Sequence, residues 1–413
     1  MDYNEFRKNA LEQYASLPNE TNDLYKKYYT EIALPSEDEM KSAKNPSNKK
    51  SVEETVVSVE EKTRLKFDLV FSNSFVRNSS ASIKIKKMNE IADKLDNKLY
   101  KSSEHKLAAF LNANSIDVII VDVTDGKKEK LNMLFVNDSP LLFQSFFTIG
   151  QDSGLELFQF YVSPQGSSSI VAPLQEFVLQ KRANVEFTFL NDGNENSTIL
   201  HLSKGSIEEN STFRANFVYN GSKISKAVNH FDACGAGSKI EVTELIYGSK
   251  EQKFDINTHI TNSKERSHTR LSTGSIMDGS SQCQLKGYAK IEKWTKGAFS
   301  NVNERGIILS EKAHIDALPD MSIDYSDQVS ATHSAATSPI DKEILFYITS
   351  RGIEEANARK MFLASFVAKY LSNIQDPPAK EVAYSMMLGR IGGNDYGVLK
   401  NTTPRGVWLT ASN

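Results

Sequence analysis

The hydrophobic pattern changes character twice along the chain, and each change predicts a different kind of structure. Near the amino end, Phe6, Ala10, Tyr14 and Leu17 recur at steps of three and four residues, which predicts a short amphipathic helix. From about residue 36 to residue 66 the chain is rich in Lys, Glu and Ser and has no aromatic residue. Such a composition buries little apolar area, so we expect a mobile or loosely helical linker over 36–66.

The middle of the chain contains many short runs rich in Val, Ile, Phe and Thr, separated by Gly, Asn, Asp and Ser, of which Phe213–Tyr219 and Ile240–Tyr247 are examples. Strands that repeat every ~8–15 residues predict a sandwich, a barrel or a β-solenoid. The region is long for one sandwich and has few of the Asn-Gly and Asp-Gly dipeptides that favour tight hairpins. We therefore favour the solenoid, a right-handed parallel β-helix.

After residue 338 the hydrophobic period becomes helical again, with apolar residues near one face from Ile353 to Leu371. The expected fold is mainly β, with a β-helix core flanked by helical regions. Its parts are an N-terminal helical or mixed region over 1–114, which includes the charged linker, the core over 115–338, and a C-terminal helical domain and tail over 339–413.

Composition and charge exclude several classes of function. Lys and Arg number 49 against 52 Asp and Glu, a net charge of −3 that indicates no nucleic-acid binder. The two cysteines, Cys234 and Cys283, build neither a disulfide framework nor a CxxC metal site, which favours a reducing, cytoplasmic setting. The amino end lacks a signal-peptide pattern, and no apolar run approaches the ~20 residues of a membrane span. No GxxxxGK[ST] motif occurs, so phosphoryl transfer must belong to a partner.

A more specific signal lies near residue 333. The run Thr-His-Ser-Ala-Ala-Thr-Ser-Pro-Ile-Asp, with His333 second, leads into Leu345-Phe346-Tyr347 and then Arg351-Gly352-Ile353. This combination resembles the signature of the SufB/SufD family, which pairs a histidine-centred turn of small residues with an LFY-x-x-x-RGI helix start. Members of that family are scaffold subunits of iron–sulfur cluster assembly. The resemblance is strong from about residue 254 to residue 371.

Within that family the chain looks like a divergent SufD. The segments Leu69–Phe75 and Leu107–Asn112 are similar to SufD segments. SufB-type members place a cysteine where this chain has Asn303-Glu304-Arg305, and a glutamate where it has Ser334. The resemblance implies a scaffold that is not an enzyme and acts with a SufC-like ABC-type ATPase and with a SufB-like subunit or a second copy of itself. It implies a transient iron–sulfur cluster in the complex and no stably bound cofactor; flavin binding stays open.

Histidine supplies the main metal candidates. His333 stands at the junction of the strand region and the helices, where a neutral imidazole can bind iron. A weaker candidate pair is His314 and Asp316, which lie two residues apart and so share one face of a strand. His259 and Cys283 are also weaker candidates, and they form a His/Cys site only if the solenoid stacks them together. For each, an ordinary structural role is the alternative.

The resemblance also implies that the C-terminal helices bind the ATPase. The candidate contacts are Ile344, Phe346, Tyr347, Arg351, Gly352, Ile353, Met361, Phe362 and Phe366. At least half of the apolar ones are expected to pack against the solenoid instead, because a solenoid needs a cap. Two rival functions remain open: a cytoplasmic β-helix enzyme acting on polysaccharide, disfavoured by the lack of a persuasive carboxylate cluster, and a homo-oligomeric scaffold, SufB-like or without a metal role.

Overall fold

The computed structural model describes residues 2–17, 49–91, 99–164, 166–324 and 327–391. The first part of the expected linker, up to residue 48, and the tail after residue 391 lie outside these residues. Among the described helices, none is long and apolar enough to cross a bilayer.

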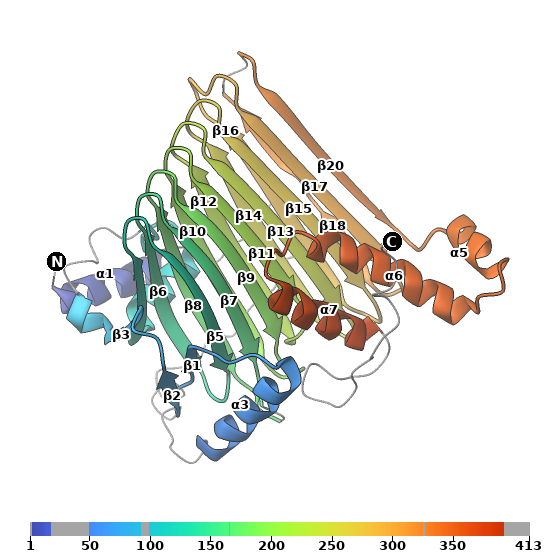
Figure 1. Cartoon of the computed structure of the whole chain (residues 1–413), viewed down its shortest axis with the longest axis horizontal. Coiled ribbons are helices and arrows are strands. Elements are labelled where there is room, and N and C mark those ends of the chain that lie inside the picture. The colour runs from blue at the N-terminus through green and yellow to red at the C-terminus, as the bar shows by residue number, and fades with distance from the viewer. Residues whose placement is uncertain (1, 18–48, 92–98, 165, 325–326, 392–413) are drawn as a thin grey trace.

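Two ten-stranded sheets face each other and build a solenoid of about eight turns, in which each turn adds one strand to each sheet (Figure 1). The first sheet contains, in spatial order, β2 (Val76–Asn78), β1 (Leu69–Phe71), β5 (Lys128–Val136), β7 (Gly154–Val162), β9 (Asn184–Asp192), β11 (Thr212–Tyr219), β13 (Lys239–Gly248), β15 (His268–Met277), β17 (Phe299–Ile308) and β20 (Ser330–Ser338). The predicted mainly β solenoid is confirmed.

The second sheet runs from the carboxyl-terminal end of the solenoid back to its amino-terminal end. It contains β18 (His314–Ala317), β16 (Gln282–Ile291), β14 (Lys253–Asn262), β12 (Ile224–Ala233), β10 (Thr198–Ile207), β8 (Ile170–Leu179), β6 (Leu141–Ile149), β4 (Asp117–Val123) and β3 (Ile83–Lys87), and β19 (Asp320–Ile323) pairs with β16 beyond β18. Strand pairs are parallel except β1–β2 and β3–β4, which close the amino-terminal end.

The alternation of inward and outward side chains explains why this sequence forms stacked strands. Inward positions carry large apolar side chains that stack from one rung to the next; the rings of Phe135 and Tyr161, for example, have centroids 4.5 Å apart. Register partners on adjacent rungs lie 26 to 32 residues apart in sequence. Because rung length varies, the sequence shows no strict repeat even though the structure is repetitive.

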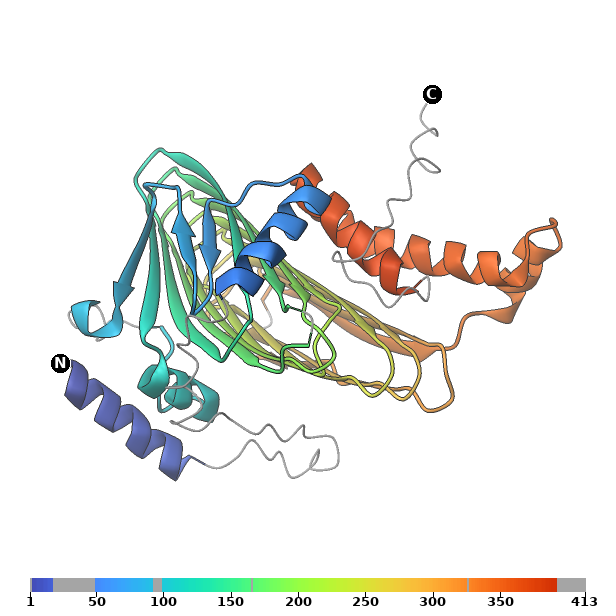
Figure 2. The ribbon, with the colours of Figure 1, turned by 90° about the horizontal axis from the view of Figure 1, so that it is seen from below.

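Helices cover opposite faces of the solenoid (Figure 2). On the second sheet, α1 (Tyr3–Ser16), the predicted amino-terminal helix, packs on α4 (Lys106–Asn114), which in turn packs on β6 and β8. On the first sheet lie α3 (Lys49–Thr63), α6 (Glu355–Leu371) and α7 (Pro377–Ile391), and α5 (Lys342–Thr349) packs on α6. Helix α3 forms within the Lys-, Glu- and Ser-rich segment because Val52, Val56 and Val59 fall on one helical face and are buried against the sheet.

Candidate functional site

At the carboxyl-terminal end of the solenoid, the last rung is not covered by a further strand among the described residues, and we call it the open rung. β20 pairs with β17 along one edge, and it is the last strand of its sheet among the described residues. Eight of its nine residues are exposed, whereas the strands before it are mostly buried. On the opposite sheet, Ile315 is buried but Ile323 is 47% exposed. The interior of the solenoid therefore opens to solvent between β20 and β18–β19.

His333 lies on the inner face of this open rung. Its register partner on β17 is Val302, which is fully buried in the solenoid core. Partners in a ladder point to the same side of the sheet, so the imidazole projects toward the interior. It is nevertheless exposed, because no further rung covers it among the described residues. The structure thus makes the strongest sequence candidate an accessible imidazole at the mouth of the solenoid.

Glu304 lies one strand below, on the same inner face. It is two residues after Val302, so its side chain also points inward, and only 1% of the residue is exposed. Its Oε1 accepts a hydrogen bond from the Gly287 N–H at 2.8 Å, whereas its Oε2 is buried and has no hydrogen-bond partner. Burial raises the pKa of Glu304 to about 8, against the opposing effect of backbone N–H groups.

A second buried carboxyl two rungs earlier shows how the solenoid normally satisfies such a group. Glu244 on β13 occupies the same inner column, in register with Thr273, which is in register with Glu304. Both of its oxygens accept hydrogen bonds from hydroxyl groups, Oε1 from Thr258 and Oε2 from Thr273 at 2.7 Å. The corresponding partner of Glu304 on β20 is Ala335, which has no hydroxyl group.

The weaker metal candidates lie elsewhere. His314 and Asp316 share the outer face of β18, as their spacing predicts, and the imidazole Nε2 lies 3.0 Å from Asp316 Oδ1. His259 is on the outer face of β14, where its ring stacks on His230, while Cys283 is buried in the core on the other side of that sheet. The structure does not bring His259 and Cys283 together. The described residues contain no group of three or more His, Cys, Asp and Glu that could hold a metal.

The candidate ATPase contacts divide into two sets. Helix α5 and the start of α6 extend past the end of the solenoid (Figure 1), and we call this part, residues 342–362, the arm. Four apolar side chains of the arm are exposed: Ile344 (41%), Phe346 (74%), Tyr347 (57%) and Met361 (36%). The others, Ile353, Phe362 and Phe366, pack against the core between the helices and the first sheet.

The turn between the two helices of the arm has a defined shape. Gly352 adopts φ +84°, a left-handed conformation that glycine tolerates best, and it follows the last turn of α5. The Arg351 guanidinium lies 4.2 Å from the centroid of the Tyr347 ring and donates a hydrogen bond to its hydroxyl. Arg351 therefore holds the Tyr347 ring in one orientation at the exposed tip.

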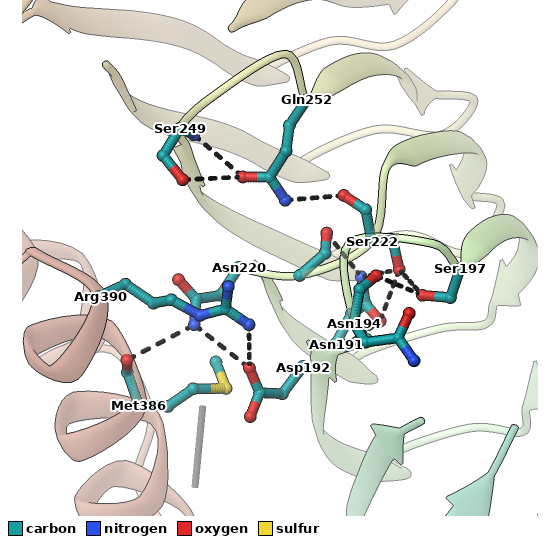
Figure 3. Close-up of polar contacts among 12 residues, drawn as sticks. Asn191, Asp192, Asn194, Ser197, Asn220, Ser222, Ser249, Gln252, Met386 and Arg390 are labelled. Carbon is teal, nitrogen blue, oxygen red and sulfur yellow. Dashed lines mark hydrogen bonds and ion pairs between the residues drawn. The ribbon is translucent and has the colours of Figure 1, made fainter. Parts of the chain in front are cut away.

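The remainder of the helical region is fastened to the solenoid. The Tyr370 ring packs on Gly274, where a Cβ would collide with it, and its hydroxyl donates to the Thr273 carbonyl. Figure 3 shows the last fastening, in which Arg390 at the end of α7 forms an ion pair with Asp192 at a corner of the solenoid. The arm is thus held at one end and extends freely beyond the solenoid at the other.

Two residues of this region escaped the sequence analysis. In the sequence analysis Glu304 appears only in the stretch where SufB-type members place a cysteine. Its position two residues after Val302, in a strand whose side chains alternate, indicates that it faces inward. Arg390 carries no comparable signal, because its partner Asp192 is 198 residues away in the sequence.

A comparison with known protein families finds a match that covers most of the solenoid, α5 and the greater part of α6. Residues 140–366, more than half of the chain, match the family described as SUF system FeS cluster assembly, SufBD core domain. Over 208 residues the chain is 24% identical to iron–sulfur cluster assembly SufBD family proteins of Staphylococcus epidermidis (strain ATCC 12228 / FDA PCI 1200) and Staphylococcus aureus (strain USA300). This alignment covers 50% of the chain and 44% of each relative, so the chain spans less than half the length of the curated relatives it matches.

Proposed function

The chain belongs to the SufBD core-domain family of SUF iron–sulfur cluster assembly proteins, and from this premise we propose that it is a SufD-like scaffold subunit of a cluster assembly complex. In this proposal it has no catalytic turnover. It acts with a SufC-like ABC-type ATPase and with a SufB-like subunit or a second copy of itself. The observation that carries the proposal is that an accessible, inward-facing His333 and the exposed arm are joined by only a few residues.

The open rung supports a protein partner at the end of the solenoid. β20 presents a long, exposed strand edge, and an exposed edge pairs readily with another strand. The neighbouring interior offers apolar side chains, including the half-exposed Ile323. A SufB-like subunit or a second copy that paired with β20 would continue the sheet and enclose His333. The iron–sulfur cluster would be assembled at that interface, where His333 would supply one imidazole ligand to iron and the partner would supply thiolate ligands.

The chain's own cysteines favour a SufD-like over a SufB-like role. Cys283 is buried in the solenoid core, and burial raises the pKa of its thiol well above the usual value. Burial also raises the pKa of the half-buried Cys234. A thiol with a raised pKa is a poor nucleophile, because the thiolate is the reactive form. We therefore assign the acceptance of sulfur in the complex to a cysteine of the SufB-like partner.

The arm supports binding of the ATPase. Phe346 and Tyr347 project from a short helix that lies beyond the solenoid, an arrangement suited to a hydrophobic groove on another protein. Closure of the nucleotide-loaded ATPase would pull on α5, which the chain connects to β20 through residues 339–341. The same movement would change the exposure of His333.

Anaerobic co-expression with a SufC-like ATPase and a SufB-like subunit tests the proposal. We expect a complex that co-purifies by size-exclusion chromatography and carries iron and sulfide, while the chain purified alone hydrolyses no ATP and holds no stable cluster. Failure of the chain to associate with either protein would overturn the proposal. Hydrolysis of a polysaccharide by the purified chain would favour the enzyme alternative.

A further inference from the structure

We propose that Glu304 is a second iron ligand from this chain, acting through its carboxylate on the same iron as His333. The inference rests on the proposed function and adds a residue and a ligand type to its site. A hard or borderline metal such as ferrous iron binds one imidazole and one carboxylate well. We base the proposal on the placement of these two side chains and on the Glu304 Oε2 atom, which is buried without a hydrogen-bond partner.

The two side chains are diagonal neighbours on one face. Glu304 is in register with Ala335, and His333 is two residues before Ala335 on the same strand. Diagonal neighbours in a sheet lie roughly 7–8 Å apart at the backbone, within reach of long side chains. Both project toward the interior of the solenoid; His333 is exposed at its mouth, while Glu304 is buried one strand below, where β20 contributes only a methyl group at Ala335. A metal ion entering from the open end would meet the imidazole first and the carboxylate behind it.

Only one of the two Glu304 carboxyl oxygens accepts a hydrogen bond. Its Oε1 is held by the Gly287 N–H, while Oε2 is buried without a hydrogen-bond partner. Leaving a buried polar atom unsatisfied is destabilising, and such atoms are rare in folded proteins. Glu244 shows that the column can satisfy a carboxyl fully, since Thr258 and Thr273 each donate to it. At the open rung the donating threonine is replaced by Ala335, which leaves the buried Oε2 atom without the hydroxyl donor that Glu244 has.

The test compares three variants in the co-purified complex. Glu304→Gln keeps an oxygen to accept from Gly287 N–H but removes the carboxylate. Glu244→Gln is the matched control, a buried carboxyl in the same column away from the opening. Ala335→Thr leaves Glu304 intact and offers Oε2 a hydroxyl like that of Thr273. For each we measure ferrous-iron affinity of the cluster-free complex by anaerobic titration, the Mössbauer spectrum of bound iron, and the melting temperature.

We expect Glu304→Gln and Ala335→Thr to weaken iron binding about tenfold or more and to change the Mössbauer parameters, with the complex still assembled. Glu244→Gln should leave the iron affinity unchanged. Iron binding at the wild-type level in both Glu304→Gln and Ala335→Thr would overturn the inference, while an assembled complex that carries a cluster would leave the proposed function standing. If Glu304→Gln fails to fold, Ala335→Thr alone decides. Absence of a complex in the wild type would instead count against the proposed function.

Discussion

Arg390 and Asp192, 198 residues apart in sequence, form an ion pair with Nη2 and Oδ1 3.0 Å apart (Figure 3). Their side chains are only 15% and 2% exposed. The Asn220 side chain joins this contact by donating to the Met386 carbonyl of α7 at 3.4 Å. Because this pair fastens the end of the last described helix to a corner of the solenoid, it gives the arm a fixed base.

Breaking this ion pair should destabilise the attachment of α7. We expect Arg390→Met to cost about 3–5 kcal/mol in the free energy of unfolding, because it leaves the Asp192 carboxylate buried without its charged partner. The exposed pair Arg182 and Asp152, both 49% exposed, provides the control, and Arg182→Met should have a much smaller effect on the free energy of unfolding, because solvent screens an exposed ion pair. Urea denaturation of both variants measures the difference. Equal effects would show that the Arg390 contact has no special role.

The exposed apolar tip of the arm should determine ATPase binding. Each of Phe346→Ala and Tyr347→Ala is expected to weaken binding by about 2 kcal/mol, roughly 30-fold in Kd, as for aromatic residues at interface centres. Trp294→Ala is the control, since Trp294 is 80% exposed in the turn between β16 and β17. Isothermal titration calorimetry with the purified ATPase checks this. Unchanged affinity in both arm variants would remove the arm from the interface.

Point substitutions serve this test better than a truncation before Asp341. The helices after that residue bury Leu245, Ile276 and Ile307 on the outer face of the first sheet. Removing them would expose this apolar surface, so the loss of binding would be mixed with loss of stability.

His333→Ala should separate cluster formation from folding. An exposed side chain can be truncated within about 0.5 kcal/mol of stability, so melting temperature and ATPase binding should stay near wild type while the complex loses its cluster. His314→Ala, which alters an exposed histidine on the outer face of β18, should retain the cluster. Visible absorption and iron content per folded complex provide the measurement. Normal cluster content in His333→Ala would exclude it from the site.

The buried His201 should make the solenoid sensitive to acid. Its imidazole stacks on Phe189 and contacts Gln175 and Ser203, and burial lowers its pKa from 6.5 to about 3. In the unfolded chain the His201 imidazole is protonated near pH 6.5, whereas in the folded chain it is protonated only near pH 3. The stabilisation from this group is thus complete above pH 6.5 and is lost as pH falls toward 3, by about 1.4 kcal/mol per pH unit.

Replacing that histidine isolates its contribution. His201→Gln should show a shallower loss of stability between pH 7 and pH 4 than the wild type, as measured by urea midpoints across that range. His230 and His259, whose pKa values burial also lowers, to about 3 and about 4, act equally in both proteins and cancel in the comparison. Parallel pH profiles for the two proteins would contradict the assignment to His201.

What the sequence by itself determined is local. The short runs rich in Val, Ile, Phe and Thr predicted stacked strands, the three- and four-residue steps near Phe6 predicted α1, and the His333 signature pointed to the family. The valines at positions 52, 56 and 59 also carried a helical signal, although the surrounding charged residues favoured a linker. Each of these follows from residues within one or two turns of structure, where side-chain periodicity decides which face is apolar.

The tertiary structure decided everything that depends on register between rungs. Because rungs vary from 26 to 32 residues, the sequence did not reveal that Cys283 and His259 face opposite sides of one sheet, or that Glu304 and His333 share the inner face of the open rung. The pairing of Asp192 with Arg390 likewise arises only when α7 packs on the solenoid. Contacts between distant residues depend on how many residues each turn takes up, and local hydrophobic pattern does not contain that number.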